Sequence, residues 1–247
     1  MRARACLFLV LAFSAASASA QTLDQLLARY VTARGGLARI RAVSSLRFTG
    51  RLTLGDISTP LVLELKRPHK MRTEFEVQGR RAVRAYDGEK GWAVLPVPGL
   101  DDPRLMPEDE NREAREQADV DLSPLVDSAA KGYSVELAGR EIRDGHDYWR
   151  LVVTARDGTA RSVFLDPKTG LAVRIEEKRF LEGQLQEFVS VIGDYRQVGG
   201  LQFPFLLEVG PRASDERQRV VFEKVEVNPL LDEARFAFAP RTAAPAR

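Results

Sequence analysis

The chain has 247 residues, of which 44% are hydrophobic and 29% charged, enough for one sizeable domain or two small ones. Its 37 basic and 35 acidic residues nearly cancel. A protein that neutralises nucleic-acid phosphates normally carries a basic excess, so we expect no nucleic-acid partner. The single cysteine, Cys6, excludes a disulfide framework and a site with several cysteine ligands.

The first twenty residues have the pattern of a secretory signal peptide. Arg2 and Arg4 form a basic start, a short apolar run follows, and an Ala-Ser-Ala cleavage site precedes Gln21. The apolar run is far shorter than the ~20 residues that span a bilayer. We therefore expect residues 1–20 to be removed. The remaining chain, 21–247, is expected to be a soluble periplasmic protein with one domain and no net charge.

Residues 22–34 are predicted to form the first helix of the mature chain. Thr22 and Gln25 fit a capping box, and apolar residues recur at helical spacing on one face. The pair Gly35-Gly36 ends this helix. A further short helical piece is expected over residues 37–43.

From Leu46 onward the apolar residues recur with a period of two. Leu46, Phe48 and Leu52 alternate with polar residues, and the same alternation continues over 61–66 and 71–78. One face of each strand is therefore apolar and the other polar, which is typical of an antiparallel sheet with one solvated face. Residues 82–86 and 92–97 are predicted to form the next hairpin.

The stretch 106–132 interrupts the strands with helical features. Pro107 suits a first helical residue, and several acidic residues follow it, where they favour the positive end of a helix dipole. A second helical piece is predicted to begin with Ser123 as its N-cap and to end at Gly132. We expect this insert to lie across the mouth of a curved sheet.

The two halves of the insert differ in composition. Between Glu108 and Gln117 only Ala114 is apolar, so this half is expected to be held loosely. In the second half, Leu122, Leu125 and Val126 are the expected apolar anchors of the lid. A movable lid and a static plug both fit this composition.

Strands resume after the insert, separated by turns rich in Gly, Asp and Pro. The predicted runs are 133–137, 147–155, 161–165, 171–179, 184–194, 203–209 and 217–227. Together with the earlier runs they make about a dozen strands, and open twisted sheets beyond ~10 strands tend to curl or split. The sequence thus predicts a mainly β fold. A curved antiparallel sheet forms an unclosed half-barrel, with the first helix and the insert over its concave face. The alternatives are a β-sandwich, which would not need the insert, and a closed lipid-binding barrel.

The sequence offers no catalytic motif. His69 and His146 each fall in a turn, and no His or carboxylate ligands recur at metal-binding spacing. Gly-rich phosphate loops and a G-x-S-x-G elbow are absent from the sequence. We therefore expect no catalytic residues, metal or cofactor, although a constellation assembled from distant strands would leave no motif.

Several segments are distinctive when they are taken in order. They are ARGG after the first helix, VSSLRFTGRL, AYDGEKGWAV, SPLVD, LDPKTGLAVRIE, DYRQVGGLQFP and VEVNPLLDEARFAFAP. Together they resemble the LolA-like and LolB-like superfamily of outer-membrane lipoprotein-sorting proteins, particularly its larger periplasmic members, over Thr22 to Pro240. The resemblance implies a half-closed barrel with helices as a lid and a cavity for acyl chains.

The resemblance also implies a lid that can be held shut. In the carrier proteins of this family, an arginine inside the barrel holds the lid through hydrogen bonds. Arg47, Arg51 and Arg72 lie on early strands, but their alternation puts them on the face opposite the leucines. The motifs therefore do not identify such an arginine here.

With this resemblance, eight apolar strand residues become candidates for lining a hydrophobic cavity, because small ligands commonly bind in apolar pockets at barrel mouths. They are Phe48, Leu52, Leu63, Leu65, Met71, Phe75, Val77 and Trp92. The alternative is that they fill an ordinary core. A lipid site would leave no charged motif, since each buried CH₂ contributes ~0.8 kcal/mol.

The first hypothesis is a periplasmic, non-enzymatic carrier or receptor that binds lipoprotein acyl chains or another hydrophobic ligand. Its expected partners are a lipoprotein or lipid cargo and membrane donor or acceptor proteins, and a monomer is expected. The alternative is an envelope sensor or protein-interaction module with the same fold and no transported cargo.

Overall fold

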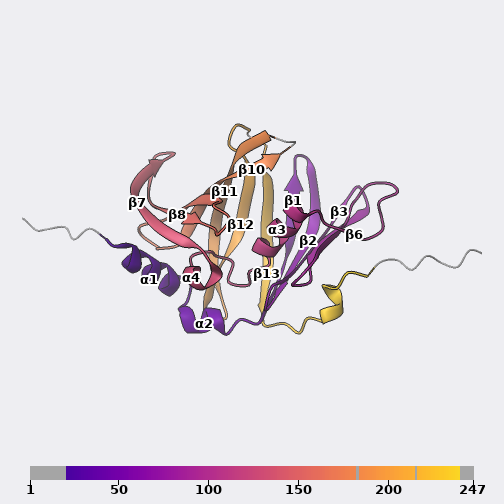
Figure 1. The fold of residues 1–247 in the computed structure, drawn as a ribbon, viewed down its shortest axis with the longest axis horizontal. Helices are drawn as coiled ribbons and strands as arrows, with labels where there is room; N and C mark the ends of the chain where they lie inside the picture. Colours follow the sequence, from indigo (N-terminus) through magenta and orange to yellow (C-terminus); the bar gives the residue numbers. More distant parts are fainter. Residues whose placement is uncertain (1–20, 182–183, 215, 240–247) are drawn as a thin grey trace, which may run out of the picture.

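The structure, a computed structural model, describes residues 21–181, 184–214 and 216–239. Thirteen antiparallel strands form a single sheet in the order β6-β5-β4-β3-β2-β1-β13-β12-β11-β10-β9-β8-β7. Each half of the sheet is a meander, and the two halves meet where β1 pairs with β13. No pairing within the described residues joins the end strands β6 and β7, and the sheet is curved but not closed (Figure 1). The predicted fold class is confirmed.

Most of the strands follow the predicted runs. Their bounds are β1 Ser45–Leu54, β2 Ile57–Lys66, β3 Lys70–Val77, β4 Arg80–Tyr86, β5 Gly91–Val94, β6 Arg104–Leu105, β7 Ser134–Arg143, β8 His146–Thr154, β9 Ala160–Leu165, β10 Ala172–Leu181, β11 Gln184–Val198, β12 Leu201–Pro211 and β13 Gln218–Val227. The short edge strand β6 was not predicted, and β7 and β11 extend beyond their predicted ends. The predicted signal peptide, 1–20, lies outside the described residues, and the division into one domain stays a prediction.

The N-terminal helices form as the sequence indicates. In α1 (Leu23–Ala33) the capping box is present, since the backbone N–H of Gln25 donates to Thr22 Oγ1 over 3.3 Å. The short helix α2 (Leu37–Arg41) follows. Between them Gly35 has φ +115°, and a Cβ at this position would lie 2.3 Å from the carbonyl oxygen of Gly200. Only glycine fits there, because the end of α1 packs against the turn between β11 and β12.

The insert contains one full helix and one shorter than predicted. The first, α3 (Glu108–Gln117), forms as predicted, except that Pro107 is its N-cap rather than its first helical residue. The predicted second helix is wrong in its start, because α4 covers only Ser128–Lys131. The residue before it, Asp127, has φ +51° and so cannot belong to a right-handed helix. Residues 119–127 therefore form turns.

The insert lies against the concave side of the sheet, where Figure 1 shows α3 between the two halves. The largest core cluster forms there, and α1, the insert and the sheet all contribute to it. Its buried members include Leu26, Tyr30, Leu46, Phe48, Leu65, Met71, Val120, Leu125, Val126, Leu151, Val153, Phe203 and Val225. The apolar strand faces thus pack mainly on the insert and α1.

The outer face of β1–β5 is covered by a C-terminal segment, residues 228–239, which includes the short 3-10 helix η1 (Glu233–Arg235). Glu64 is buried beneath it and accepts a hydrogen bond from Arg235 Nε over 2.7 Å. Trp92 Nε1 donates to the carbonyl oxygen of Phe236 over 2.7 Å, and Phe236 is fully buried. The polar strand face is therefore partly covered in this half of the sheet, although Arg51 and Glu76 remain exposed.

Acid is expected to loosen this C-terminal segment. Hydrogen bonds from Lys66 and Lys70 lower the pKa of Glu233 to about 2 from 4.5. A depressed carboxyl pKa gives a stabilising contribution that is present above pH ~4.5 and is lost as the pH falls towards 2. In a Trp149→Phe background, the fluorescence of Trp92 should shift to longer wavelengths across this range as the segment detaches.

The matched variant for this measurement is Glu233→Gln, which cannot form the ion pairs at any pH. It should show part of the fluorescence shift already at pH 7 and a shallower change in acid. Identical titrations of the two proteins between pH 7 and pH 3 would contradict the role given to Glu233.

Candidate functional site

Two cavities adjoin the insert. The smaller, here called the inner pocket, has a volume of about 50 Å³ and lies between α1, the insert and β9–β12. Its lining residues are Tyr30, Arg34, Leu122, Ser123, Pro124, Val163, Ala172, Ile175, Ile192, Tyr195 and Pro204. One water needs about 10–15 Å³ of cavity volume measured in this way, so the pocket holds only a few waters and is far too small for an acyl chain. The insert fills the trough that the sheet forms.

Arg34, at the C-terminal end of α1, ties three parts of the molecule together beside the inner pocket. Its guanidinium is buried and donates to Tyr30 Oη over 2.9 Å, to the carbonyl oxygen of Asp121 over 3.2 Å and to that of Gln202 over 3.1 Å. Asp121 belongs to the insert and Gln202 to β12. Arg34 therefore holds the insert against α1 and the sheet through hydrogen bonds.

Asp121 anchors the same part of the insert through its side chain. Its carboxylate is only 6% exposed and lies 2.5 Å from Arg67 Nη2 and 2.8 Å from Lys131 Nζ. Lys131 also lies 2.6 Å from Asp119. Charge-assisted hydrogen bonds of this kind are stronger than neutral ones, so residues 119–121 are firmly attached.

The C-terminal end of the turns, at Asp127, is attached to α2. Arg41 donates two hydrogen bonds to Asp127, over 2.9 Å from Nε and 2.7 Å from Nη2, in a bidentate arrangement. The hydrogen bonds from Arg41 lower the pKa of Asp127. Asp127 therefore stays ionised, and the pair fixes the residue whose left-handed backbone ends the turn.

Tyr195 supplies a neutral polar group in the wall of the inner pocket. Burial raises the pKa of its hydroxyl well above the ordinary value, and the nearby Tyr30 adds to the shift. The hydroxyl stays protonated and donates to the carbonyl oxygen of Ala172 over 2.7 Å. The hydroxyl is thus occupied by the backbone, which leaves the middle of this wall apolar.

The larger cavity, here called the charged cleft, has a volume of about 1160 Å³ and lies between α3, β7–β11 and Arg212. Fourteen of its twenty lining residues are charged. It forms because neighbouring strands end at different points. The last β9–β10 pair is Arg161 with Glu177, whereas β10 continues beside β11 to Leu181. The sheet is split beyond that pair, and both of its faces line the cleft.

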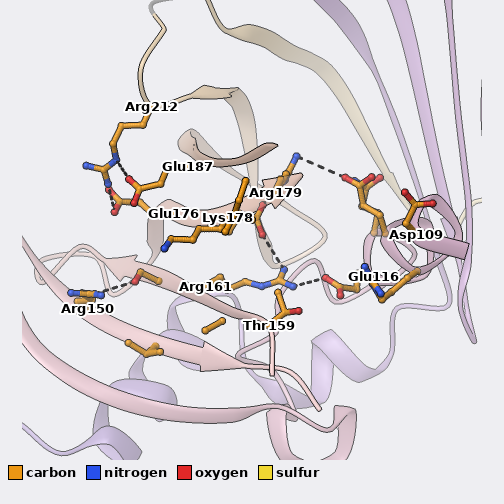
Figure 2. A pocket seen from close by; sticks show the side chains of 18 of the residues that line it. Asp109, Glu116, Arg150, Thr159, Arg161, Glu176, Lys178, Arg179, Glu187 and Arg212 are labelled. Atoms are coloured by element: carbon orange, nitrogen blue, oxygen red, sulfur yellow. Dashed lines mark hydrogen bonds and ion pairs between the residues drawn. The ribbon is translucent and has the colours of Figure 1, made fainter. Parts of the chain in front are cut away.

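α3 is held between the two halves of the sheet by ion pairs. On one side Arg84 of β4 lies 3.1 Å from Glu113. On the other side Arg161 of β9 pairs with Glu116, as Figure 2 shows. Arg179 of β10 lies 3.8 Å from Glu113. Ala114 is the one fully buried residue in the helix, so charges rather than apolar packing hold it in place.

Salt is therefore expected to loosen α3 selectively. The Debye length falls from about 10 Å at 0.1 M salt to about 3 Å at 1 M, which weakens partly exposed ion pairs. Hydrogen–deuterium exchange of residues 108–117 should be several-fold faster in 1 M NaCl than in 0.05 M NaCl. Residues 120–126, which are held by apolar burial, serve as the internal control and should change little. Equal acceleration in both halves would contradict this account.

Seven of the eight predicted cavity residues belong to or pack against a core cluster, Val77 being the exception, and none of the eight lines either of the two cavities described above. By alternation and pairing, seven lie on the concave side, where most of them belong to or pack against the main core cluster. Trp92 lies on the outer face instead, in a second small cluster with Val83 and Ala85. Their role in ligand binding stays a prediction, which depends on movement of the insert.

The predicted lid residues do face the sheet. Leu125 is 3% exposed and Val126 is fully buried, and both belong to the main core cluster. Leu122 is partly buried and lines the inner pocket. Sequence reasoning missed Arg34, although the segment ARGG contains it, because its partners lie up to 168 residues away. The charged cleft was also missed.

The two histidines, His69 and His146, are exposed, the first in a turn and the second at the start of β8. Within the described residues, no group of three His, Cys, Asp or Glu side chains is placed to hold a metal ion. None of the helices that the structure describes is long and apolar enough to cross a membrane.

The geometry defines a class of protein, an unclosed antiparallel half-barrel with a helical insert packed in its trough. Solved structures share this fold. A DUF1329 family protein from Desulfovibrio piger matches at a TM-score of 0.58 and 14% identity, over 87% of this chain and 97% of its own. A LolA superfamily protein from Nitrosomonas europaea matches at 0.57 and 13%, over 87% and 97% of the two chains.

A candidate outer membrane lipoprotein-sorting protein domain from Vibrio parahaemolyticus matches at a TM-score of 0.55 and 13% identity, over 86% of this chain and 94% of its own. No protein-family model and no curated protein matches the chain. The particular fold is therefore that of the LolA-like proteins, as the sequence resemblance implied, and it extends over most of the chain.

Proposed function

We propose that this protein is a periplasmic, non-enzymatic carrier or receptor for a lipidated or otherwise hydrophobic molecule. The observation that carries the proposal is the apolar concave face of the sheet, which a separate segment of the chain covers. In this proposal acyl chains take the place of Leu125 and Val126 of the insert, which pack in the main core cluster. The likeness of the fold to a LolA superfamily protein and to a candidate lipoprotein-sorting domain supports the same function.

Loading requires the insert to move, because the inner pocket holds only about 50 Å³. Displacing Leu122, Leu125 and Val126 from the sheet costs roughly 2 kcal/mol for each side chain. A long acyl chain that takes their place regains on the order of 10 kcal/mol before its ordering cost. The apolar part of this exchange therefore favours the acyl chain, and that gain offsets the hydrogen bonds and ion pairs of Arg34, Asp121 and Asp127 that must break as the insert moves.

Native mass spectrometry of the protein purified from the periplasm tests this proposal. The expected result is a bound lipid or acylated peptide that is removed by delipidation and taken up again from added lipid. The absence of both bound lipid and lipid uptake would contradict it. The matched control is a Leu230→Asp variant, which should take up lipid like the unchanged protein, because Leu230 is 98% exposed and lies outside the insert.

The expected partners follow from the proposed cargo. A carrier or receptor of this kind would exchange lipoprotein or lipid with a membrane donor or acceptor protein and would act as a monomer.

A second function, an envelope sensor or protein-interaction module, is favoured by one surface feature. The segment between β5 and α3 exposes Val97, Leu100 and Leu105, each to between 45% and 49%. Crosslinking in envelope extracts discriminates the two functions. A stable protein partner together with no lipid uptake supports the sensor or interaction module, whereas lipid uptake supports the carrier.

A further inference from the structure

The outer wall of the charged cleft is positive. It is formed by strands β7, β8, β10 and β11 together with the residue that follows β12, and four cations outnumber two carboxylates. These lining residues are Arg143, Arg150, Lys178, Arg212, Glu176 and Glu187. Arg212 spans both carboxylates, at 2.5 Å from Glu176 and 3.0 Å from Glu187. Arg143 and Arg150 pair instead with Glu141, which is not a lining residue, at 3.1 Å for Arg150, so Lys178 is the one cation of this wall without an ion-pair partner among the described residues.

The inner wall of the cleft has the opposite sign. It is formed by α3 and the concave side of β9 and β10, and five carboxylates outnumber three cations. These lining residues are Asp109, Glu110, Glu113, Glu116, Glu177, Arg112, Arg161 and Arg179. The cleft as a whole is neutral, but its charge is separated across the open space.

Each wall has charged groups that no other described residue neutralises. The side chain of Lys178 is exposed and makes no hydrogen bond or ion pair within the described residues. The guanidinium of Arg143 pairs with Glu141 through Nη2, but its Nε is buried without a hydrogen-bond partner. On the inner wall, the carboxylates of Asp109 and Glu110 are also without a partner in the described chain. Figure 2 shows Lys178 and Asp109 on opposite sides of the cleft. A ligand with one charge of each sign would satisfy both walls.

The cleft adjoins the inner pocket along two strands. Val163 of β9 and Ile175 of β10 line the inner pocket. Two residues further along the same strands, Arg161 and Glu177 line the cleft. Two residues of a strand cover about 7 Å, so charged and apolar surfaces meet within the length of a small head group.

We infer that the ligand is an amphiphile with a zwitterionic head group. Its phosphate or carboxylate lies against the outer wall near Lys178, and its ammonium group lies against the carboxylates of α3. Its acyl chain runs along β9 and β10 into the inner pocket as the insert is displaced. This inference rests on the proposed function and adds the chemical class of the ligand.

The test compares three lipids with the same oleoyl chain, each titrated below its micellar concentration by isothermal titration calorimetry. They are lysophosphatidylethanolamine, which is zwitterionic, oleate, which is an anion, and monooleoylglycerol, which is neutral. The zwitterion is expected to bind about tenfold more tightly than either of the others, because each charged hydrogen bond in the cleft adds affinity.

Two sets of substitutions assign the preference to the two walls. One variant carries Lys178→Gln, and a second carries both Asp109→Asn and Glu110→Gln. Each should weaken binding of the zwitterion several-fold and leave binding of monooleoylglycerol unchanged. Lys224→Gln is the control, because Lys224 lies on β13, pairs with Glu226 at 3.3 Å and does not line the cleft.

Three results would overturn the inference while leaving the proposed function intact. These are equal affinity for the zwitterion and monooleoylglycerol, tighter binding of oleate than of the zwitterion, and substitutions that weaken all three lipids equally. Binding of none of the three lipids would instead contradict the proposed function itself.

Discussion

Replacing Arg34 with methionine is expected to destabilise the protein by about 3 kcal/mol or more. Methionine fills similar space but donates no hydrogen bond. The carbonyl oxygens of Asp121 and Gln202 and the hydroxyl of Tyr30 would then lose a charged donor in a buried place. Each buried acceptor without a partner costs roughly 1–3 kcal/mol, reduced where water enters. Urea unfolding followed by circular dichroism measures the loss.

The matched control is Arg39→Met on α2. Arg39 is exposed and donates a single hydrogen bond, to the carbonyl oxygen of Gly35 over 2.9 Å. Its replacement should change the free energy of unfolding by about 0.5 kcal/mol or less. If the two variants were equally stable, Arg34 would not be the residue that fixes the insert.

The Arg34 variant should also separate a movable lid from a static plug. If the insert opens as a unit, hydrogen exchange of residues 118–127 should accelerate more than that of β1 and β13, and lipid uptake should become faster. A uniform acceleration across the sheet would show that the insert is only part of the global core.

The second large effect is expected from Leu125→Ala, at about 2–4 kcal/mol. Leu125 is 3% exposed and packs in the main core cluster, so truncation leaves a cavity between insert and sheet. The same substitution at Leu230, which is 98% exposed, is the matched control and should change stability by less than about 0.5 kcal/mol. Differential scanning calorimetry of the two variants measures the contrast, and similar melting temperatures would contradict the packing described here.

Much of the fold follows from local pattern. The alternation that begins at Leu46 predicts the strands, because one-sided burial has a period of two in any strand. The capping box at Thr22 and Gln25 and the left-handed cap at Gly132 are local hydrogen-bonding features, and both are present. The second helix of the insert failed as a prediction because the left-handed backbone of Asp127 is not encoded by a distinctive residue type.

Parts of the candidate site could not be predicted because they depend on contacts between distant segments. Trp92 has the same apolar character as Met71, yet it lies on the other face, where the C-terminal segment covers the sheet. Arg34 reaches partners 87 and 168 residues away. The charged cleft exists because β9 begins at Ala160 while β10 continues beside β11, a difference in length that no single strand reveals.

The sequence by itself determined that the chain forms a one-sided antiparallel sheet with an insert, because alternation, caps and turns act over a few residues. Only the tertiary structure decided that the insert fills the trough, that Arg34 holds it there, and that a split in the sheet brings charges from both faces to one cleft. Burial and charge pairing act between side chains that are close in space. The positions of these residues in the sequence do not indicate that they are close.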